Sequence, residues 1–131
     1  MRVIGRVESP LADARAAPRQ GDEGAPDAWL VFAPDVREAA RDLAVGDDVL
    51  LLTWLHRADR GVQRVHPRSD PGRPERGVFS TRSPDRPNPI GLHRVQILDV
   101  DGDKLLVRGL EALDGTPILD VKPVLDAGTD R

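Results

Sequence analysis

An Asp-Gly-Asp turn between two apolar runs constrains the fold of this chain more than any other feature. Residues 101–103 separate Gly91–Val100 from Leu105–Leu110, and both runs have the length and apolar content of strands. Asp-Gly between two such runs is a strong β-hairpin signal, because glycine readily adopts the positive φ that a tight turn requires. The sequence therefore predicts an antiparallel pair of strands in the C-terminal half.

The remaining runs extend this pattern to five or six strands without an alternating βαβ series. Val49–Leu55 is continuously apolar, which predicts a central strand buried on both faces, and the spacing within Asp35–Leu43 predicts a short amphipathic helix. Glu8–Asp27 and the segment His66–Gly77 are rich in Pro, Gly and charge and are expected to be loops. We therefore expect a mainly β fold, a small single-sheet antiparallel β-barrel with one or two short helices and long loops, and no Rossmann fold. The other predicted strands are Arg2–Val7, Trp29–Phe32 and Pro117–Val121.

Composition excludes several classes of protein. The chain has 131 residues and no cysteine, so we expect one domain without disulfides, thiolate catalysis or cysteine-bound zinc. Glycine-rich nucleotide-binding motifs, a zincin motif and a nucleophile elbow are also absent from the sequence. No apolar run approaches the roughly 20 residues of a membrane span, and the N-terminus lacks the apolar core of a signal peptide. We expect a cytoplasmic protein that does not bind membranes.

The charge of the chain is unevenly distributed. The formal net charge is −3, yet the segment from His56 to Arg94 holds nine arginines against four carboxylates. A basic segment on an acidic protein is typical of a local anion-binding face, and equally of a solvated arginine-rich loop. Charge alone leaves both interpretations open.

The segment Arg82–Gly91, called the proline segment below, is the strongest candidate for a functional site. Pro84, Pro87 and Pro89 each fix their own φ and push the preceding residue towards extended conformations. A rigid backbone that carries Arg82, Arg86 and Asn88 holds these side chains in place before a ligand arrives, which reduces the entropy lost on binding. A loop stiffened only for stability would not require the polar residues.

Three weaker candidates stand beside the proline segment. Leu113–Pro117 has the composition of an ordinary tight turn, and Pro18-Arg19-Gln20 is notable only because it interrupts a long loop. His56 ends an apolar run, where a histidine is more often structural than catalytic. His66 and His93 have no partners at a ligand spacing, so we predict no metal site.

The runs GVFSTRSPDRPNPIGL and LDGTPILDVKP together resemble the signature of the TrmO family, also called the YaeB or TsaA-like family. The resemblance extends from VIGRVESP near the start to DVKPVL near the end. It implies a methyltransferase domain over residues 1–126 with a short tail at 127–131. It also implies a β-barrel that binds S-adenosylmethionine (S-adenosyl-L-methionine) and, as in characterised bacterial members, methylation of N6 of threonylcarbamoyladenosine next to the anticodon of tRNA.

Carried over by position, the resemblance implies cofactor contacts in four segments. These are Pro18, Arg19 and Gln20; His56 and Arg57; Arg82 and Leu92 around the proline segment; and the turn of Asp114, Gly115, Thr116 and Pro117, called the DGTP turn below. The expected roles of the remaining candidates concern the acceptor. Asn88 and Asp114 are the candidate catalytic residues that position the acceptor nitrogen, while Arg86 and Asn88 are expected to bind substrate.

Two alternatives keep the same fold. The chain is then either a methyltransferase with another RNA or a small molecule as acceptor, or a non-catalytic barrel that binds RNA or protein. Short strands at open sheet edges often gain a covering partner, and related proteins dimerise near the cofactor, so we expect a homodimer.

Overall fold

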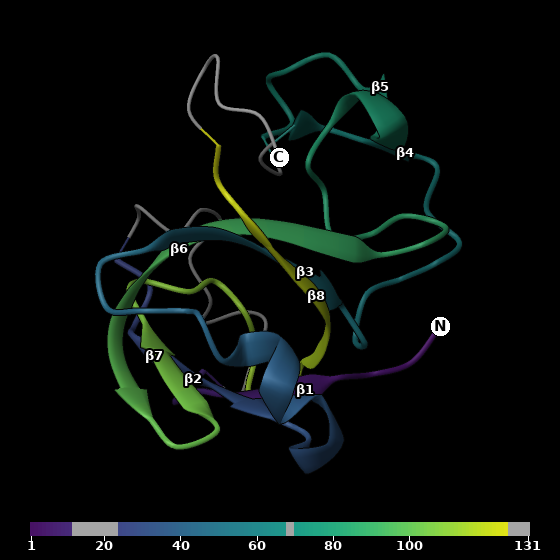
Figure 1. Cartoon of the computed structure of the whole chain (residues 1–131). Helices are drawn as coiled ribbons and strands as arrows, with labels where there is room; N and C mark the ends of the chain where they lie inside the picture. Colours follow the sequence, from purple (N-terminus) through teal and green to yellow (C-terminus); the bar gives the residue numbers. More distant parts are fainter. Residues whose placement is uncertain (12–23, 68–69, 126–131) are drawn as a thin grey trace.

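The strands close into one small barrel. The computed structural model describes residues 1–11, 24–67 and 70–125, and its barrel runs in the order β1-β2-β7-β6-β3-β8, with every neighbouring pair antiparallel (Figure 1). The predicted mainly β, single-sheet barrel is confirmed. The elements of the barrel are β1 (Gly5–Glu8), β2 (Ala28–Phe32), the 3-10 helix η3 (Pro34–Ala40), β3 (Asp48–Trp54), β6 (Ile90–Asp101), β7 (Lys104–Val107) and β8 (Pro117–Pro123).

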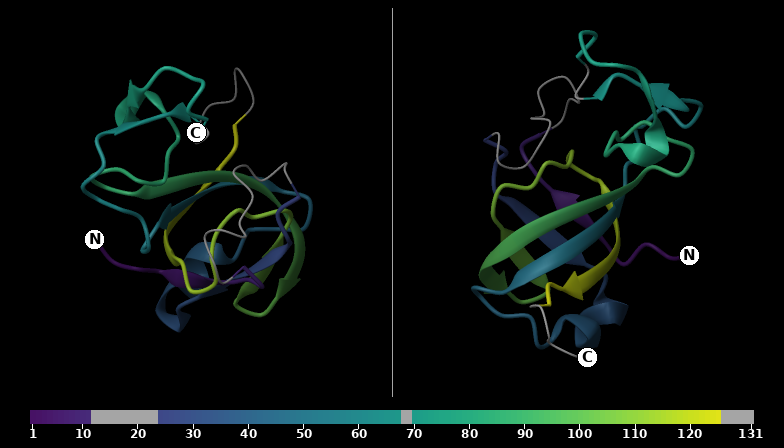
Figure 2. Two further views of the ribbon diagram at one scale, coloured as in Figure 1. Left: turned by 180° about the vertical axis from the view of Figure 1, so that it is seen from behind. Right: turned by 90° about the horizontal axis from the view of Figure 1, so that it is seen from above.

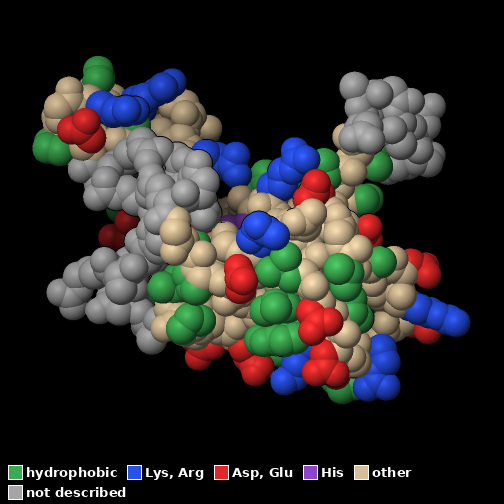
Figure 3. All heavy atoms as spheres, turned by 90° about the vertical axis from the view of Figure 1, so that its left-hand side faces the viewer, with side chains coloured by type: hydrophobic (Ala, Val, Ile, Leu, Met, Phe, Trp, Pro, Cys, Tyr) green, Lys and Arg blue, Asp and Glu red, His purple; other side chains and the backbone are tan. Residues whose placement is uncertain are grey.

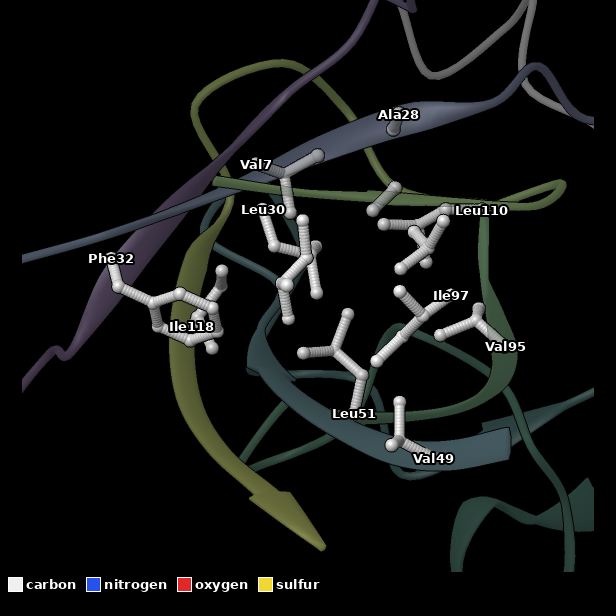
Figure 4. Close-up of a cluster of buried hydrophobic side chains, with 13 residues drawn as sticks. Val7, Ala28, Leu30, Phe32, Val49, Leu51, Val95, Ile97, Leu110 and Ile118 are labelled. Carbon is white, nitrogen blue, oxygen red and sulfur yellow. The ribbon is translucent and has the colours of Figure 1, made fainter. Parts of the chain in front are cut away.

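The interior of the barrel is aliphatic. Alternate residues of each strand point inward, as the two-residue period of a strand requires, and meet in a single cluster (Figure 4). Leu30, Leu51, Ile97 and Ile118 are almost completely buried there. At roughly 1.5–3 kcal/mol for each buried large side chain, this cluster is the main source of stability for the barrel.

The predicted hairpin is confirmed. Asp101 of β6 pairs with Lys104 of β7, so Gly102 and Asp103 form a two-residue turn. Gly102 has a φ of +62°, the left-handed conformation that the sequence pattern required of it.

The predicted short amphipathic helix is present as a 3-10 helix over Pro34–Ala40, and none of its residues is fully buried. Its apolar residues Val36 and Ala40 pack against the edge of the core. The prediction that β3 is buried on both faces is wrong, since Val49, Leu51 and Thr53 are buried while Leu50, Leu52 and Trp54 are only half-buried. A closed barrel has one interior, so one face of every strand lies outside it.

The described residues between 55 and 89 (55–67 and 70–89) form a lobe outside the barrel. The lobe contains β4 (Arg64–Val65), β5 (Arg76–Gly77) and the 3-10 helix η5 (Val78–Ser80), and β4 pairs with β5 in a two-stranded ribbon. This ribbon falls partly in the expected loop His66–Gly77 and was not predicted. Figures 1 and 2 show the lobe standing above the barrel, and it joins β3 and β6 where Trp54 pairs with Ile90.

Candidate functional site

The proline segment is held by hydrogen bonds as well as by its prolines. The Arg86 guanidinium donates from Nη1 to the carbonyl oxygens of Thr81 (3.0 Å) and Ser83 (3.2 Å). Pro89 is fully buried, and its carbonyl accepts a hydrogen bond from the Leu55 N–H at 2.8 Å. The segment is therefore anchored at both ends, in agreement with the rigidity expected from its sequence.

A cleft of about 430 Å³ opens beside the proline segment. Its lining residues are Phe79, Thr81, Arg82, Arg86, Pro87, Asn88 and Ile90. No carboxylate is among them, so the cleft combines two guanidinium groups and an amide with apolar walls. Figure 3 shows a hollow above the barrel and beside the lobe, with Lys or Arg side chains at its base. This composition suits a ligand with an anionic or carbonyl group next to a planar apolar part.

Phe79 supplies the aromatic ring in the lining of the cleft. Its side chain is 81% exposed, and the Arg86 guanidinium carbon lies 5.9 Å from the ring centroid. This contact adds a second restraint to Arg86, whose carbonyl contacts already fix one of its nitrogens. Arg86 therefore stabilises the segment that carries it and lines the cleft at the same time.

Arg82 links the cleft to the first residues of β6. Its Nη2 donates to the Leu92 carbonyl at 2.9 Å. The side chains of Leu92 and Ile90 lie on the outer face of β6 and are 44% and 45% exposed. Arg82 and Leu92, expected on either side of the proline segment in a cofactor site, are thus in direct contact.

A polar pair lies on the inner face of the same strand end. Thr53 Oγ1 and His93 Nε2 are 2.9 Å apart, and Thr53 is fully buried. Burial, with a smaller contribution from the positive charge of Arg82, lowers the pKa of His93 to about 4. The imidazole is neutral at pH 7. Gly91 lies over this pair, and a Cβ on it would come within contact of both side chains.

The DGTP turn is tied to β1. The N–H of Gly115 donates to the Val7 carbonyl, and Arg6 Nη1 donates to the Gly115 carbonyl at 3.2 Å. Asp114 Oδ1 accepts a hydrogen bond from the Ser9 N–H at 3.0 Å, and Gly115 has a φ of +82°. Pro117 and Thr116 are buried, whereas Asp114 is exposed. The Asp114 carboxylate therefore remains accessible from solvent.

His56 lies in the same neighbourhood as the DGTP turn. Partial burial, followed by the positive charges of Arg57 and Arg6, lowers the pKa of His56 below its usual value. Because Arg6 also contacts Gly115, it connects the two segments. His56 and the DGTP turn, far apart in the chain, share this arginine as a neighbour.

The register of β3 relates the proline segment to the DGTP turn. Thr53 pairs with Gly91 on one side and with Ile118 on the other, with a register shift next to it. Neighbouring strands are about 4.8 Å apart, so the start of β6 and the start of β8 lie about 10 Å apart at the same end of the barrel. Asp114 does not line the cleft itself. Pro18, Arg19 and Gln20 lie outside the described residues.

Two residues of the cleft region were missed in the sequence. Phe79 lies within the run GVFSTRSPDRPNPIGL but was not singled out, because its exposure has no signal in the sequence. Arg60 lies in the lobe at 5.2 Å from the Trp54 ring centroid and contacts the proline segment, although nothing in the local sequence distinguishes it from the other eight arginines nearby. Among the described residues no group of three or more His, Cys, Asp or Glu side chains could hold a metal ion.

The fold and the cleft define a class, that of small closed β-barrels with an arginine-lined cleft at one end. Residues 6–129 match the model of the tRNA-methyltransferase O N-terminal domain. The chain belongs to this family, as the resemblance in its motifs indicated. No helix among the described residues is long and apolar enough to cross a membrane.

Similar proteins extend over nearly the whole chain. A "Probable S-adenosyl-L-methionine-binding protein" of Methanothermobacter thermautotrophicus is 44% identical over 94% of this chain and 88% of its own length. An "S-adenosyl-L-methionine-binding protein" of Archaeoglobus fulgidus is 41% identical over 93% of this chain and 86% of its own length. The crystal structure of TrmO from Pseudomonas aeruginosa matches 94% of this chain with a TM-score of 0.73 and 32% identity. This chain spans 54% of that structure.

Proposed function

We propose that this chain is an S-adenosylmethionine-dependent methyltransferase that acts on N6 of threonylcarbamoyladenosine next to the anticodon of tRNA. The observation that carries the proposal is the match to the tRNA-methyltransferase O N-terminal domain over residues 6–129, together with an arginine-lined cleft formed by the most distinctive motif of the sequence. The domain is proposed to comprise residues 1–126; the tail at 127–131 lies outside the described residues.

The side chains at this end of the barrel fit the cofactor chemically. S-adenosylmethionine supplies an electrophilic methyl group on a sulfonium, and it also carries a carboxylate, an ammonium and a planar adenine. Arg82 offers a guanidinium for the carboxylate, the walls of the cleft offer apolar surface for the adenine, and the exposed Asp114 offers a negative charge for a cationic group. We propose that His56, Arg57, Leu92 and the DGTP turn complete this site, with Pro18, Arg19 and Gln20 from the N-terminal loop.

The residues of the chain act on the acceptor mainly by positioning. A fixed near-attack geometry supplies several kcal/mol of a transfer barrier, and the anchored proline segment is suited to that task. Arg86 and Asn88 are proposed to bind the acceptor, and arginines of the 57–76 segment are proposed to contact RNA phosphates. Asn88 and Asp114 are proposed to position the acceptor nitrogen, which loses its proton as it gains the methyl group.

A homodimer is part of the proposal. Ile90 and Leu92 present exposed apolar side chains on the outer face of β6, and Phe79 adds another nearby. A second copy covering this face would bury apolar surface close to the cleft. Light scattering coupled to size-exclusion chromatography measures the oligomeric state, and a monomer at micromolar concentration would refute this part.

Cofactor binding is tested by isothermal titration with S-adenosylmethionine. The wild-type chain should bind, and Arg82→Ala should bind at least about tenfold more weakly, because one charge-assisted hydrogen bond is lost. Arg41→Ala is the matched control, since Arg41 pairs with Glu38 of η3, away from the cleft. Equal binding by wild type and Arg82→Ala would remove Arg82 from the site.

The acceptor is tested by mass spectrometry of tRNA nucleosides from a deletion strain. Loss of N6-methylated threonylcarbamoyladenosine, restored by the wild-type gene, supports the proposal. An unchanged nucleoside with retained cofactor binding would favour a different RNA or small-molecule acceptor. An unchanged nucleoside together with no binding of S-adenosylmethionine would favour a non-catalytic barrel.

A further inference from the structure

Arg60 joins the lobe to the proline segment. Its Nε donates to the Pro87 carbonyl at 2.7 Å, and its Nη2 donates to Asn88 Oδ1 at 3.1 Å. The guanidinium also stacks over Trp54 at the end of β3, 5.2 Å from the ring centroid. Three contacts thus hold one exposed arginine in place.

A second hydrogen bond next to Arg60 also joins the lobe to the proline segment. The N–H of Asp59 donates to Asp85 Oδ1 at 2.8 Å, and Asp59 Oδ1 accepts from the Gly61 N–H at 2.8 Å. The turn that carries Arg60 is therefore bound to the proline segment at Asp85 as well as at Pro87 and Asn88. Loss of the Arg60 side chain alone leaves this second attachment in place.

The contact with Arg60 determines which end of the Asn88 amide is available. A guanidinium only donates hydrogen bonds, so the amide oxygen must face Arg60 and the NH₂ group must face away from it. No described residue accepts a hydrogen bond from the Asn88 amide nitrogen, and Asn88 lines the cleft. Asn88 therefore offers two N–H donors to the cleft, while its amide oxygen already accepts a hydrogen bond from Arg60.

We propose that Arg60 is a positioning residue that orients Asn88 as a hydrogen-bond donor for an oxyanion or carbonyl group of the acceptor. The cleft supports this class of ligand, because Arg82 and Arg86 line it with Asn88 and no carboxylate does. The inference rests on the proposed transferase function for the identity of the ligand as an acceptor. It assigns Asn88 a donor role and no part in proton acceptance, because a neutral amide is a very weak base and the neighbouring Arg60 guanidinium makes it weaker still.

The substitution Asn88→Asp separates the donor role from the alternatives. Aspartate has nearly the same shape and keeps the contact with Arg60, now as an ion pair, so the fold and the proline segment are retained. It cannot donate, and its charge repels an oxyanion. If Asn88 instead accepted a proton or served only as a structural partner of Arg60, Asn88→Asp would match or exceed the wild type.

The first assay measures methyl transfer to tRNA from a deletion strain. We expect KM for tRNA to rise at least about tenfold in Asn88→Asp and Asn88→Ala, with the Kd for S-adenosylmethionine changed less than about twofold. Arg60→Met keeps the stacking on Trp54 but removes the donors, and should raise KM in the same direction. Arg41→Ala is the control. A wild-type KM in Asn88→Asp, with unchanged melting temperature, would overturn the inference.

The second assay does not depend on transfer. The side-chain NH₂ resonances of Asn88 are assigned by their loss in Asn88→Asp, and inorganic phosphate is titrated as a probe oxyanion. These resonances should move in the wild type, and the movement should be at least halved in Arg60→Met. No movement in the wild type would refute the donor role even if transfer to tRNA is observed. Movement without any transfer would support the donor role and refute the proposed function.

Discussion

Gly91 provides a quantitative test of how the end of the barrel is packed. A Cβ at this position would overlap Thr53 Oγ1 and would lie 2.8 Å from His93 Nε2 and 3.1 Å from Leu55 Cδ2. Thr53 is fully buried within the sheet, so neither it nor the backbone can move away cheaply. Gly91→Ala therefore forces the Thr53–His93 pair apart.

The magnitude follows from two contributions. Overpacking a core position by one carbon costs about 1–3 kcal/mol, and the loss of the 2.9 Å contact between Thr53 and His93 adds about 1 kcal/mol. Together they lower the free energy of unfolding by about 2–4 kcal/mol. For a chain of this length about 4 °C corresponds to 1 kcal/mol, so the melting temperature should fall by about 8–16 °C.

Gly77→Ala is the matched control. Gly77 has a φ of −62°, and the nearest atom to a Cβ placed there is the Gln63 carbonyl oxygen at 4.0 Å. Its melting temperature should change by less than about 2 °C. In the double variant Gly91→Ala, Thr53→Ala, the overlapping hydroxyl is gone, so the two costs should be less than additive. A Gly91→Ala protein that melts within about 2 °C of the wild type would refute this account of the packing.

Two further predictions concern the same end of the barrel. Because the pKa of His93 is lowered to about 4, the folded state binds fewer protons than the unfolded state at acidic pH. The contribution of His93 to the free energy of unfolding should be complete above pH 6.5 and should fall by about 3 kcal/mol as the pH drops to 4. Urea unfolding measures this pH dependence, which should be weaker in His93→Gln. If both proteins show the same pH dependence, His93 is not the group responsible. Thr116 is buried and donates from Oγ1 to the Leu113 carbonyl at 2.7 Å, so Thr116→Val, which keeps the shape and removes the donor, should lower the free energy of unfolding by about 1 kcal/mol; an unchanged melting temperature would contradict this role.

The sequence predicted the barrel better than its surroundings. The hairpin at Gly102 and the strands of the sheet depend on local signals, namely turn chemistry and runs of apolar residues, and these signals are readable in one dimension. The burial of both faces of β3 was predicted wrongly, because an apolar run does not reveal whether the sheet closes. The short helix at Pro34–Ala40 was predicted, but its 3-10 type was not, because the spacing of a few apolar residues that touch the edge of a core does not distinguish the two helix types.

In the candidate site, too, the features that depend on neighbouring residues could be predicted and the long-range contacts could not. The prolines of the proline segment restrict their own backbone, so its rigidity could be anticipated from residues next to one another. The contacts of Arg60 with Pro87 and Asn88 join positions separated by 27 and 28 residues, and no local pattern encodes them. The orientation of the Asn88 amide is therefore a property that only the folded structure provides.

The pairing of Trp54 with Ile90 has a consequence for how this protein can be altered. The chain leaves the barrel and returns to it at adjacent positions, so residues 55–89 amount to an enlarged connection between two consecutive strands. Loop length adds only about 0.6 kcal/mol for each doubling, and long insertions at such a point are therefore inexpensive. A short turn in place of the lobe would leave all six barrel strands and their hydrogen-bonded neighbours intact, whereas the cleft would be lost. The barrel and the cleft are thus formed largely by separate stretches of one small chain.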